Sequence, residues 1–297
     1  MENLRGAALM TAAMACFALE DMFIKLMASA MPVGQILILL GTGGALIFAA
    51  LTRATGARVF DGALRHPAVQ LRCLGELIGT MGFVTAIALT PISSASAILQ
   101  ATPLVVTLGA ALFLGAEVGW RRWTAIAVGF VGVLLIIRPG AADFEPLSLF
   151  ALQGVFGLAI RDLATRRVPA DISSMQLSTY AFATVIPAGV AMMAAMGQGP
   201  VLPDAGDWGY LAGALTIGVM GYYWIVGAMR IGDIAFVTPF RYSRLVFALF
   251  VGIFVFSENP DALTYLGATI IVGSGLYTLL REAQAARRRP AASLSRP

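Results

Sequence analysis

The chain has 297 residues, of which 59% are hydrophobic and only 12% are charged. A soluble domain contains about 45–50% apolar residues, so this composition and the mean hydropathy of +0.83 exclude an ordinary soluble fold. The 20 basic residues outnumber the 16 acidic ones. Membrane topology accounts for this excess, so it gives no reason to expect nucleic-acid binding.

Apolar runs fill almost the whole chain and leave no room for a soluble domain. Each run has about 17–25 residues, the length that crosses a bilayer as a helix. We therefore expect an all-α membrane protein with ten transmembrane helices, followed by a basic cytoplasmic tail at 283–297. The expected helices lie at 4–27, 33–52, 69–90, 92–114, 122–139, 146–165, 174–196, 206–229, 232–256 and 262–281.

Basic residues concentrate on one side of the expected membrane. With the N-terminus in the cytoplasm, 16 of the 20 lie in or beside cytoplasmic segments, namely Arg5, Arg53, Arg58, Arg65, Arg72, Arg121, Arg122, Arg161, Arg166, Arg167, Arg230, Arg281, Arg287, Arg288, Arg289 and Arg296. The external loops are mainly acidic. This bias is the positive-inside pattern, and it predicts a bacterial inner-membrane protein with both termini in the cytoplasm.

The second half of the chain repeats polar positions of the first half at a fixed offset of 141 residues. The matched pairs are Asp21 and Asp162, Lys25 and Arg166, Gln35 and Gln176, Glu117 and Glu258, and Gly132 and Gly273. Each half holds five expected spans, an odd number, so the second half must enter the membrane upside down. We therefore expect two inverted five-helix repeats, at 1–140 and 141–282. Secondary transporters often have this architecture and bind substrate near the membrane midplane.

Short motifs near the fourth and ninth spans are similar to those of a known family. They are ALTPISSA at 88–95, LGAE at 114–117, RDLATRR at 161–167, PFRYSRL at 239–245 and FSENPD at 256–261. On these motifs the chain resembles the EamA-type carriers of the drug/metabolite transporter superfamily, and in particular the branch with S-adenosylmethionine and riboflavin carriers. The resemblance covers roughly 4–282. It implies two inverted bundles in which the fifth and tenth helices are peripheral and the others surround a central cavity.

Two arginines in the ninth span are the strongest candidates for substrate binding. Arg241 lies about nine residues into the expected span, about 14 Å deep, and Arg244 shares its helix face. Charge at this depth is costly and marks a functional site. The alternative is that an arginine only holds helices together through a carboxylate or carbonyl groups. The offset maps Arg241 onto Gln100, so we expect both side chains to face the substrate.

Glu76 and three aromatic residues complete the candidate substrate site. Glu76, in the third span, could reach the cavity as a counter-charge or proton carrier, or it could pair with Arg72 one turn away. Tyr223, Trp224 and Tyr242 could form apolar walls beside the arginines. The alternative for these aromatic residues is core packing or an interfacial belt.

Two acid–base pairs stand at corresponding places in the two halves. Asp21 with Lys25, and Asp162 with Arg166, have the four-residue spacing that favours an ion pair on a helix. Inversion places the first pair near the outer end of its helix and the second near the inner end. The pairs could therefore act as gates on the two sides, or they could be interfacial anchors whose basic tips reach water.

These features favour a secondary transporter that moves a small polar or anionic organic metabolite, such as an amino acid, vitamin or nucleotide-like compound, by alternating access. The sequence has no recognisable catalytic constellation, metal-ligand cluster or phosphate-binding loop, so we expect no enzyme activity, cofactor or metal. The expected partners are a small-molecule substrate and the lipid bilayer, and the peripheral helices are the surface that a homodimer would use. Two alternatives stay open: efflux of cationic hydrophobic compounds, and a receptor or scaffold that does not transport.

Overall fold

The structure, a computed structural model, describes residues 2–59, 62–115, 119–141, 144–169, 171–231 and 234–288. The first half forms α1 (Glu2–Met27), α2 (Val33–Ala54), η1 (Gly62–Arg65), α3 (Pro67–Leu89), α4 (Ile92–Leu99), α5 (Thr102–Phe113) and α6 (Trp120–Ile137). The second half forms η2 (Pro146–Ser148), α7 (Leu149–Thr165), α8 (Ser174–Ala195), α9 (Ala205–Ile231), α10 (Ile234–Val237), η3 (Thr238–Tyr242), α11 (Ser243–Phe256) and α12 (Ala262–Arg288).

Ten segments of the described chain are long and apolar enough to cross a membrane. One of them joins α4 and α5 (Ile92–Phe113), and another joins η3 and α11 (Thr238–Phe256). The prediction of an all-α membrane protein with ten spans is therefore confirmed. The C-terminal end differs, because α12 continues to Arg288. The first residues of the expected tail are thus helical, and 289–297 lie outside the described residues.

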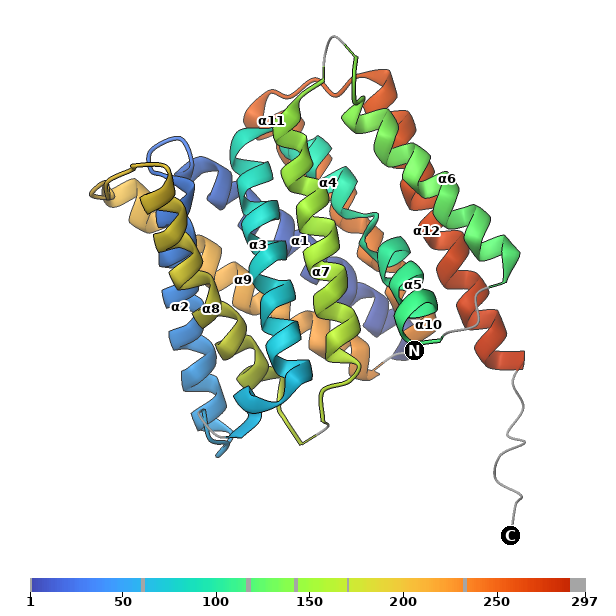
Figure 1. Cartoon of the computed structure of the whole chain (residues 1–297), viewed down its shortest axis with the longest axis horizontal. Coiled ribbons are helices and arrows are strands. Elements are labelled where there is room, and N and C mark those ends of the chain that lie inside the picture. Colours follow the sequence, from blue (N-terminus) through green and yellow to red (C-terminus); the bar gives the residue numbers. More distant parts are fainter. Residues whose placement is uncertain are drawn as a thin grey trace.

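Helices of the first half pack against helices of the second half. α3 lies along α7, α1 along α9, α2 along α8 and α6 along α12 (Figure 1). Exchanging the two halves maps this set of pairs onto itself, which is the pairing expected if a two-fold axis relates them. α6 and α12 form one edge of the bundle in Figure 1, in the peripheral place that the resemblance implies.

Glycines allow α3 and α7 to approach closely. A Cβ atom added to Gly157 would lie 2.2 Å from the backbone nitrogen of Gly79, and one added to Gly75 would lie 2.5 Å from that of Arg161. Small residues at this spacing let two backbones meet in a membrane, where dispersion contacts replace the hydrophobic driving force. The close contact brings Arg161 of α7 beside Glu76 of α3.

The fourth and ninth spans are both interrupted, at corresponding positions of the two halves. Gln100 lies in the turn between α4 and α5, and Arg241 lies in the 3₁₀ segment η3 between α10 and α11. Pro103 and Pro239 stand at these breaks because proline has no N–H to donate inside a helix. A broken helix in a membrane protein must bury its free backbone groups in protein or in a wet cavity. The interruptions therefore mark where a polar site can form.

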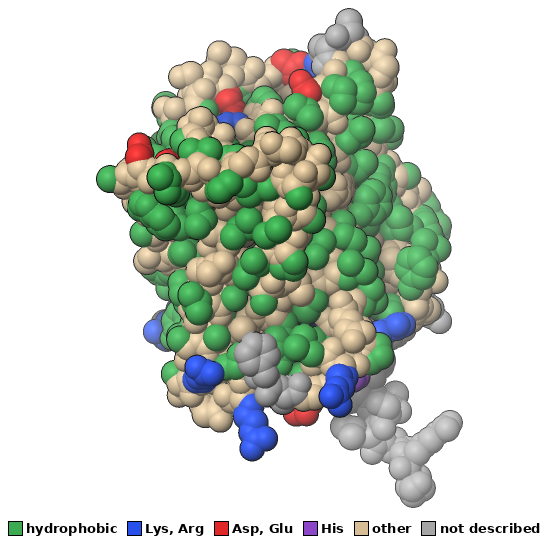
Figure 2. Space-filling view, turned by 60° about the vertical axis from the view of Figure 1, so that its left-hand side comes forward, with side chains coloured by type: hydrophobic (Ala, Val, Ile, Leu, Met, Phe, Trp, Pro, Cys, Tyr) green, Lys and Arg blue, Asp and Glu red, His purple; other side chains and the backbone are tan. Residues whose placement is uncertain are grey.

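Charge is unevenly distributed over the surface. On the face in Figure 2, hydrophobic side chains cover the middle, Lys and Arg side chains gather mainly at the lower end, and Asp and Glu mainly at the upper end. The first turn of α1 and the last turn of α12 lie toward the lower end in Figure 1. This is the charge arrangement expected of a multi-pass protein whose lower end faces the cytoplasm.

Candidate functional site

Arg244, at the start of α11, lies inside the bundle and binds Asp21 of α1. Its Nη2 atom donates to both carboxylate oxygens of Asp21, at 2.9 and 2.7 Å, and Asp21 is only 3% exposed. The guanidinium also lies over the rings of Phe17 and Phe83, 5.5 and 5.1 Å from their centroids. An arginine between two aromatic faces and a carboxylate is oriented before any ligand arrives.

Several polar groups near the two interruptions have no hydrogen-bond partner within the described part of the chain. They are Nε of Arg244, Nε2 of Gln100 and Oγ of Ser96, all buried. Ser96 lies on α4, which packs against α11, and Gln100 follows the end of α4. Unsatisfied buried donors are rare in native proteins and need an explanation. A polar ligand between α4 and α11 would provide one.

Arg241 lies on η3, at the second interruption. Within the described residues it makes no hydrogen bond or ion pair, although Asp162 of α7 attracts its charge and Arg161 and Arg244 repel it. Two arginines and an amide therefore lie at or beside the paired interruptions. The direct role that the sequence assigned to Arg241 and Gln100 in substrate binding stays a prediction.

A second network, which we call the outer network, joins the C-terminal ends of α1 and α11 to the N-terminal end of α4; the charge pattern predicts that this end faces outward. Lys25 lies 3.7 Å from the carboxylate of Glu258 and donates to the carbonyl oxygens of Ile87 and Thr90. Glu258 also accepts from the backbone nitrogen of Ser93 at 3.0 Å and from its hydroxyl at 2.6 Å. Because Lys25 and Glu258 come from different halves, this network joins the two halves at this end of the bundle.

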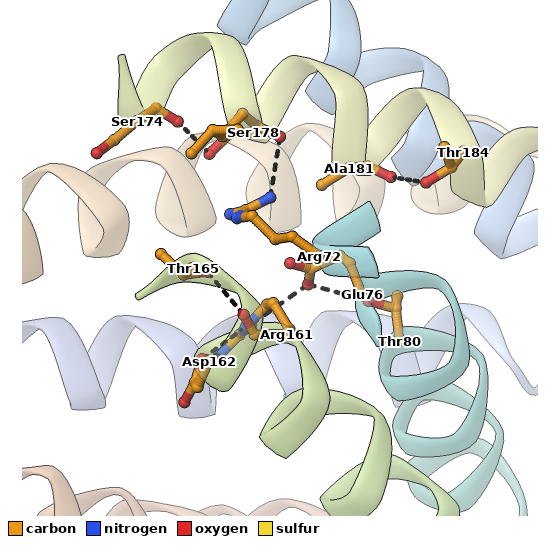
Figure 3. A network of polar contacts seen from close by, with 11 residues as sticks. Arg72, Glu76, Thr80, Arg161, Asp162, Thr165, Ser174, Ser178, Ala181 and Thr184 are labelled. Carbon is orange, nitrogen blue, oxygen red and sulfur yellow. Dashed lines mark hydrogen bonds and ion pairs between the residues drawn. The ribbon is translucent and has the colours of Figure 1, made fainter. Parts of the chain in front are cut away.

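A third network lies between α3 and α7 (Figure 3). Arg161 binds Glu76 at 3.3 Å and its neighbour Asp162 at 2.9 Å, and Thr80 donates to Glu76. Arg72 points away from Glu76 and donates instead to the carbonyl oxygen of Leu177 on α8, at 3.0 Å. The predicted alternative of a Glu76–Arg72 pair is therefore wrong, because the close α3–α7 contact offers Glu76 a nearer cation.

Both predicted four-residue ion pairs are also wrong. Asp21 binds Arg244, and Lys25 binds Glu258. In the second half Asp162 binds Arg161, while the side chain of Arg166 is exposed. In the first half, the two side chains that could meet along α1 bind charges on other helices instead. In the second half, Asp162 binds its neighbour on α7. Glu117, the counterpart of Glu258, lies outside the described residues.

The three aromatic candidates have different surroundings. Tyr223 is 70% exposed, and its assignment as a wall residue stays a prediction. Trp224 packs with Met10, Met14 and Val237 in a separate apolar cluster. The hydroxyl of Tyr242 lies against Gly275 of α12, where an added Cβ would meet it. The rings that do contact Arg244 belong to Phe17 and Phe83, on α1 and α3.

Sequence reasoning missed four contributors to these networks, namely Phe17, Phe83, Ser93 and Ser96. Each is an unremarkable residue in an apolar helix, and only the packing of distant helices brings it to a charged group. The chain gives no sign of a metal centre in the described ranges, where no three His, Cys, Asp or Glu residues form a group that could hold a metal ion.

Known proteins resemble the chain over most of its length. The model of the EamA-like transporter family matches residues 4–138 and 146–280. The S-adenosylmethionine uptake transporter of Rickettsia prowazekii is 26% identical over 71% of this chain and 71% of its own length. The riboflavin transporter of Vibrio cholerae is 30% identical over 73% of each chain. The likeness expected from the sequence motifs is therefore confirmed.

Two further comparisons extend to nearly the whole chain. The pseudopaline exporter of Pseudomonas aeruginosa is 24% identical over 90% of this chain and 93% of its own length. A solved crystal structure superposes on 92% of this chain and 98% of its own with a TM-score of 0.57, at 20% identity. At that identity the structural likeness shows the fold alone.

Proposed function

Because this chain belongs to the EamA-like transporter family, we propose that it is a secondary carrier for a small polar or anionic organic metabolite. It works by alternating access, in which a central site opens to one side of the inner membrane at a time. The two halves are inverted repeats, and both termini are cytoplasmic. The relatives are named for S-adenosylmethionine, riboflavin and pseudopaline, so their cargo varies within a class of small organic compounds.

The observation that carries this proposal is the guanidinium of Arg244, held by Asp21 and two aromatic rings while its Nε stays unpartnered. A carboxylate or phosphate of the substrate can bind the fork of Arg244 in place of Asp21. The flat or apolar part of the substrate would lie against Phe17 and Phe83. Arg241 and Gln100 supply further donors from the two interruptions.

The outer network is the closed gate of this carrier. Lys25, Glu258 and Ser93 join the two halves at the external end, so they must separate before substrate can enter or leave there. Arg161, Glu76 and Asp162 join α7 to α3 toward the cytoplasmic end. We propose that these two networks, rather than the four-residue pairs, respond to opening on their own sides.

The cation-efflux alternative is less well supported at Glu76, the carboxylate on which it was based. It requires a carboxylate that is free to hold a cationic compound, and it relied on Glu76. That carboxylate binds Arg161 at 3.3 Å and accepts a hydrogen bond from Thr80. A cationic compound at Glu76 would compete with Arg161 for the carboxylate and would lie beside the positive charge of that guanidinium, which Asp162 holds in place at 2.9 Å.

Ligand-dependent stabilisation against heating tests the proposal. The purified protein is heated with S-adenosylmethionine, riboflavin, amino acids, nucleotides and organic cations in turn. We expect an anionic or zwitterionic compound to raise the melting temperature of the wild type and of the exposed control Arg5→Ala, but not of Arg244→Ala. Arg244→Lys should restore little, because ammonium lacks the planar fork. Equal stabilisation of Arg244→Ala, or stabilisation by cations alone, would contradict the proposed site.

Reporter fusions test the orientation. Fusions after Arg58, Arg167 and Arg288 should report a cytoplasmic location, and a fusion after Asp204 an external one. An external signal at Arg58 or Arg167 would contradict the inverted arrangement.

A further inference from the structure

One carboxylate of the membrane-spanning region is not used by any of the networks above. Glu20 lies on α1, seven residues before its end at Met27 and so about 10 Å along the helix from that end. Its carboxylate lies against the backbone of α9, where a Cβ atom added to Gly218 would be 2.7 Å from Oε1. The missing side chain at Gly218 is what leaves room for this carboxylate between the two helices.

Glu20 has no hydrogen bond and no ion pair with any residue that the structure describes. The charges that act on it are the neighbouring Asp21, which repels its negative charge, and Arg244 of α11, which attracts it. Arg244 is already bound to Asp21 through both carboxylate oxygens. On α1, Cys16 lies one turn before Glu20, and on α9 the contact is with glycine backbone. The charge of Glu20 is therefore uncompensated.

An uncompensated carboxylate inside a membrane protein has a high free-energy cost as the anion. A proton removes that charge without requiring any further ligand. A metal or sodium ion would need several oxygen ligands around it, whereas the oxygens of Asp21 are occupied and no metal-binding group exists among the described residues. A proton is thus the ion that fits this position.

We propose that Glu20 is the proton-binding residue that couples this carrier to a proton gradient. This inference rests on the proposed function and identifies its coupling ion. When the anionic group of a substrate binds Arg244, Asp21 loses its cation and the negative charge around Glu20 increases. Proton uptake by Glu20 then becomes more favourable, and by linkage the proton strengthens substrate binding equally. Proton and substrate therefore move in the same direction.

The first test needs no substrate. Dicyclohexylcarbodiimide reacts with protonated carboxyl groups in apolar surroundings, and peptide mass spectrometry locates the adduct. We expect an adduct on Glu20 that weakens as the pH is raised from mildly acidic to mildly alkaline. Glu20→Gln should lose this adduct, and Glu2→Gln, an exposed control on the same helix, should keep it. A wild-type Glu20 that stays unlabelled throughout the pH range overturns the proposal.

The second test separates coupling from transport. Proteoliposomes are given radiolabelled S-adenosylmethionine, riboflavin or glutamate as probes, first at equal pH and then with an imposed proton gradient. We expect the wild type to exchange a probe at equal pH and to accumulate it with the gradient, whereas Glu20→Gln exchanges it without accumulation. Accumulation by a folded Glu20→Gln variant, or a wild type that exchanges but never responds to the gradient, overturns the proposal.

The outcomes distinguish the two claims. If none of the probes is exchanged at equal pH, the failure concerns the proposed function with these compounds, and the carbodiimide labelling decides the proton site. If a probe protects Glu20 from labelling only when it carries a cationic group, Glu20 binds substrate instead of a proton, and the coupling proposal is wrong.

Discussion

Asp21 and Asp162 occupy the same position in the two halves but bind their cations differently. Asp21 accepts hydrogen bonds from Arg244, which lies 223 residues away on α11. Asp162 forms an ion pair with its neighbour Arg161, which also binds Glu76 on α3. The residue before each aspartate makes the difference, because it is Glu20 in the first half and Arg161 in the second.

The two halves share a fold, but their aspartates have different roles. Asp21 binds an arginine of the candidate substrate site, whereas Asp162 belongs to a network that holds α3 and α7 together. In the second half the cation is the neighbouring residue, so Arg161, Asp162 and Glu76 form their ion pairs within α3 and α7. In the first half two adjacent acids compete for one arginine, and Glu20 is left without a partner. The Nε atom of Arg244 is buried and has no hydrogen-bond partner among the described residues. Sequence divergence between repeats is thus what creates the polar asymmetry of the bundle.

We expect the largest effect from a substitution at the α3–α7 contact, which brings Arg161 beside Glu76. Gly157→Val should abolish folding, because a Cβ atom there would lie 2.2 Å from the backbone nitrogen of Gly79. Gly273→Ala is the matched control, since nothing lies within 4 Å of its added Cβ, and its stability should stay within about 0.5 kcal/mol. Size-exclusion chromatography and thermal unfolding measure both. A folded, stable Gly157→Val variant would contradict the packing described here.

The next effect compares the two aspartates directly. Asp21→Asn leaves Arg244 without its only ion-pair partner and should cost about 3–5 kcal/mol of unfolding free energy. Asp162→Asn should cost less, about 1–2 kcal/mol, because Arg161 keeps Glu76. Denaturant unfolding in detergent measures the difference. Equal losses of unfolding free energy would mean that the Asp21–Arg244 and Asp162–Arg161 pairs contribute equally, which would contradict the difference between the halves described above.

A smaller effect concerns the outer gate. Lys25→Ala removes the ion pair with Glu258 and should raise the outward-open population about tenfold, or about 1.4 kcal/mol. Ser94, which lines a cavity of about 290 Å³ beside Glu258, is replaced by cysteine as the reporter, and an impermeant thiol reagent is added outside. The native Cys16 and Cys73 are buried. Arg166→Ala, which changes an exposed cation, should leave the labelling rate unchanged. Equal labelling rates in the Lys25→Ala and Arg166→Ala variants would contradict the proposed gate.

The smallest effect comes from an exposed ion pair at the outer rim. Hydrogen bonds from Arg138 and Thr264 lower the pKa of Asp261 to about 2, whereas an unfolded aspartate has a pKa of about 3.9. The stabilisation is therefore complete above about pH 4 and is lost as the pH falls toward about 2. Because Asp261 is largely exposed, we expect less than about 1 kcal/mol. Asp261→Asn should remove this acid-dependent part of stability, and an unchanged pH profile would contradict it.

The fold was largely predictable from the sequence, and the site only in part. Long apolar runs predict spans because the bilayer imposes their length, but the breaks in the fourth and ninth spans were not predicted. The arginine pair stands out because charge is rare in such helices. The partners of Asp21 and Lys25 were not predictable, since four-residue spacing describes one isolated helix. Partner choice in the bundle depends on which helices pack together, and no local pattern contains that information.

Gln100 and Arg241 stand at corresponding breaks, yet one is neutral and the other is charged. If the two halves were identical throughout, symmetry would give the proposed inward-open and outward-open forms equal free energies. The unlike residues at the two breaks are one of the differences that remove this equality. We therefore expect that exchanging the amide and the guanidinium at these breaks would shift the balance between the two forms while the fold stayed the same.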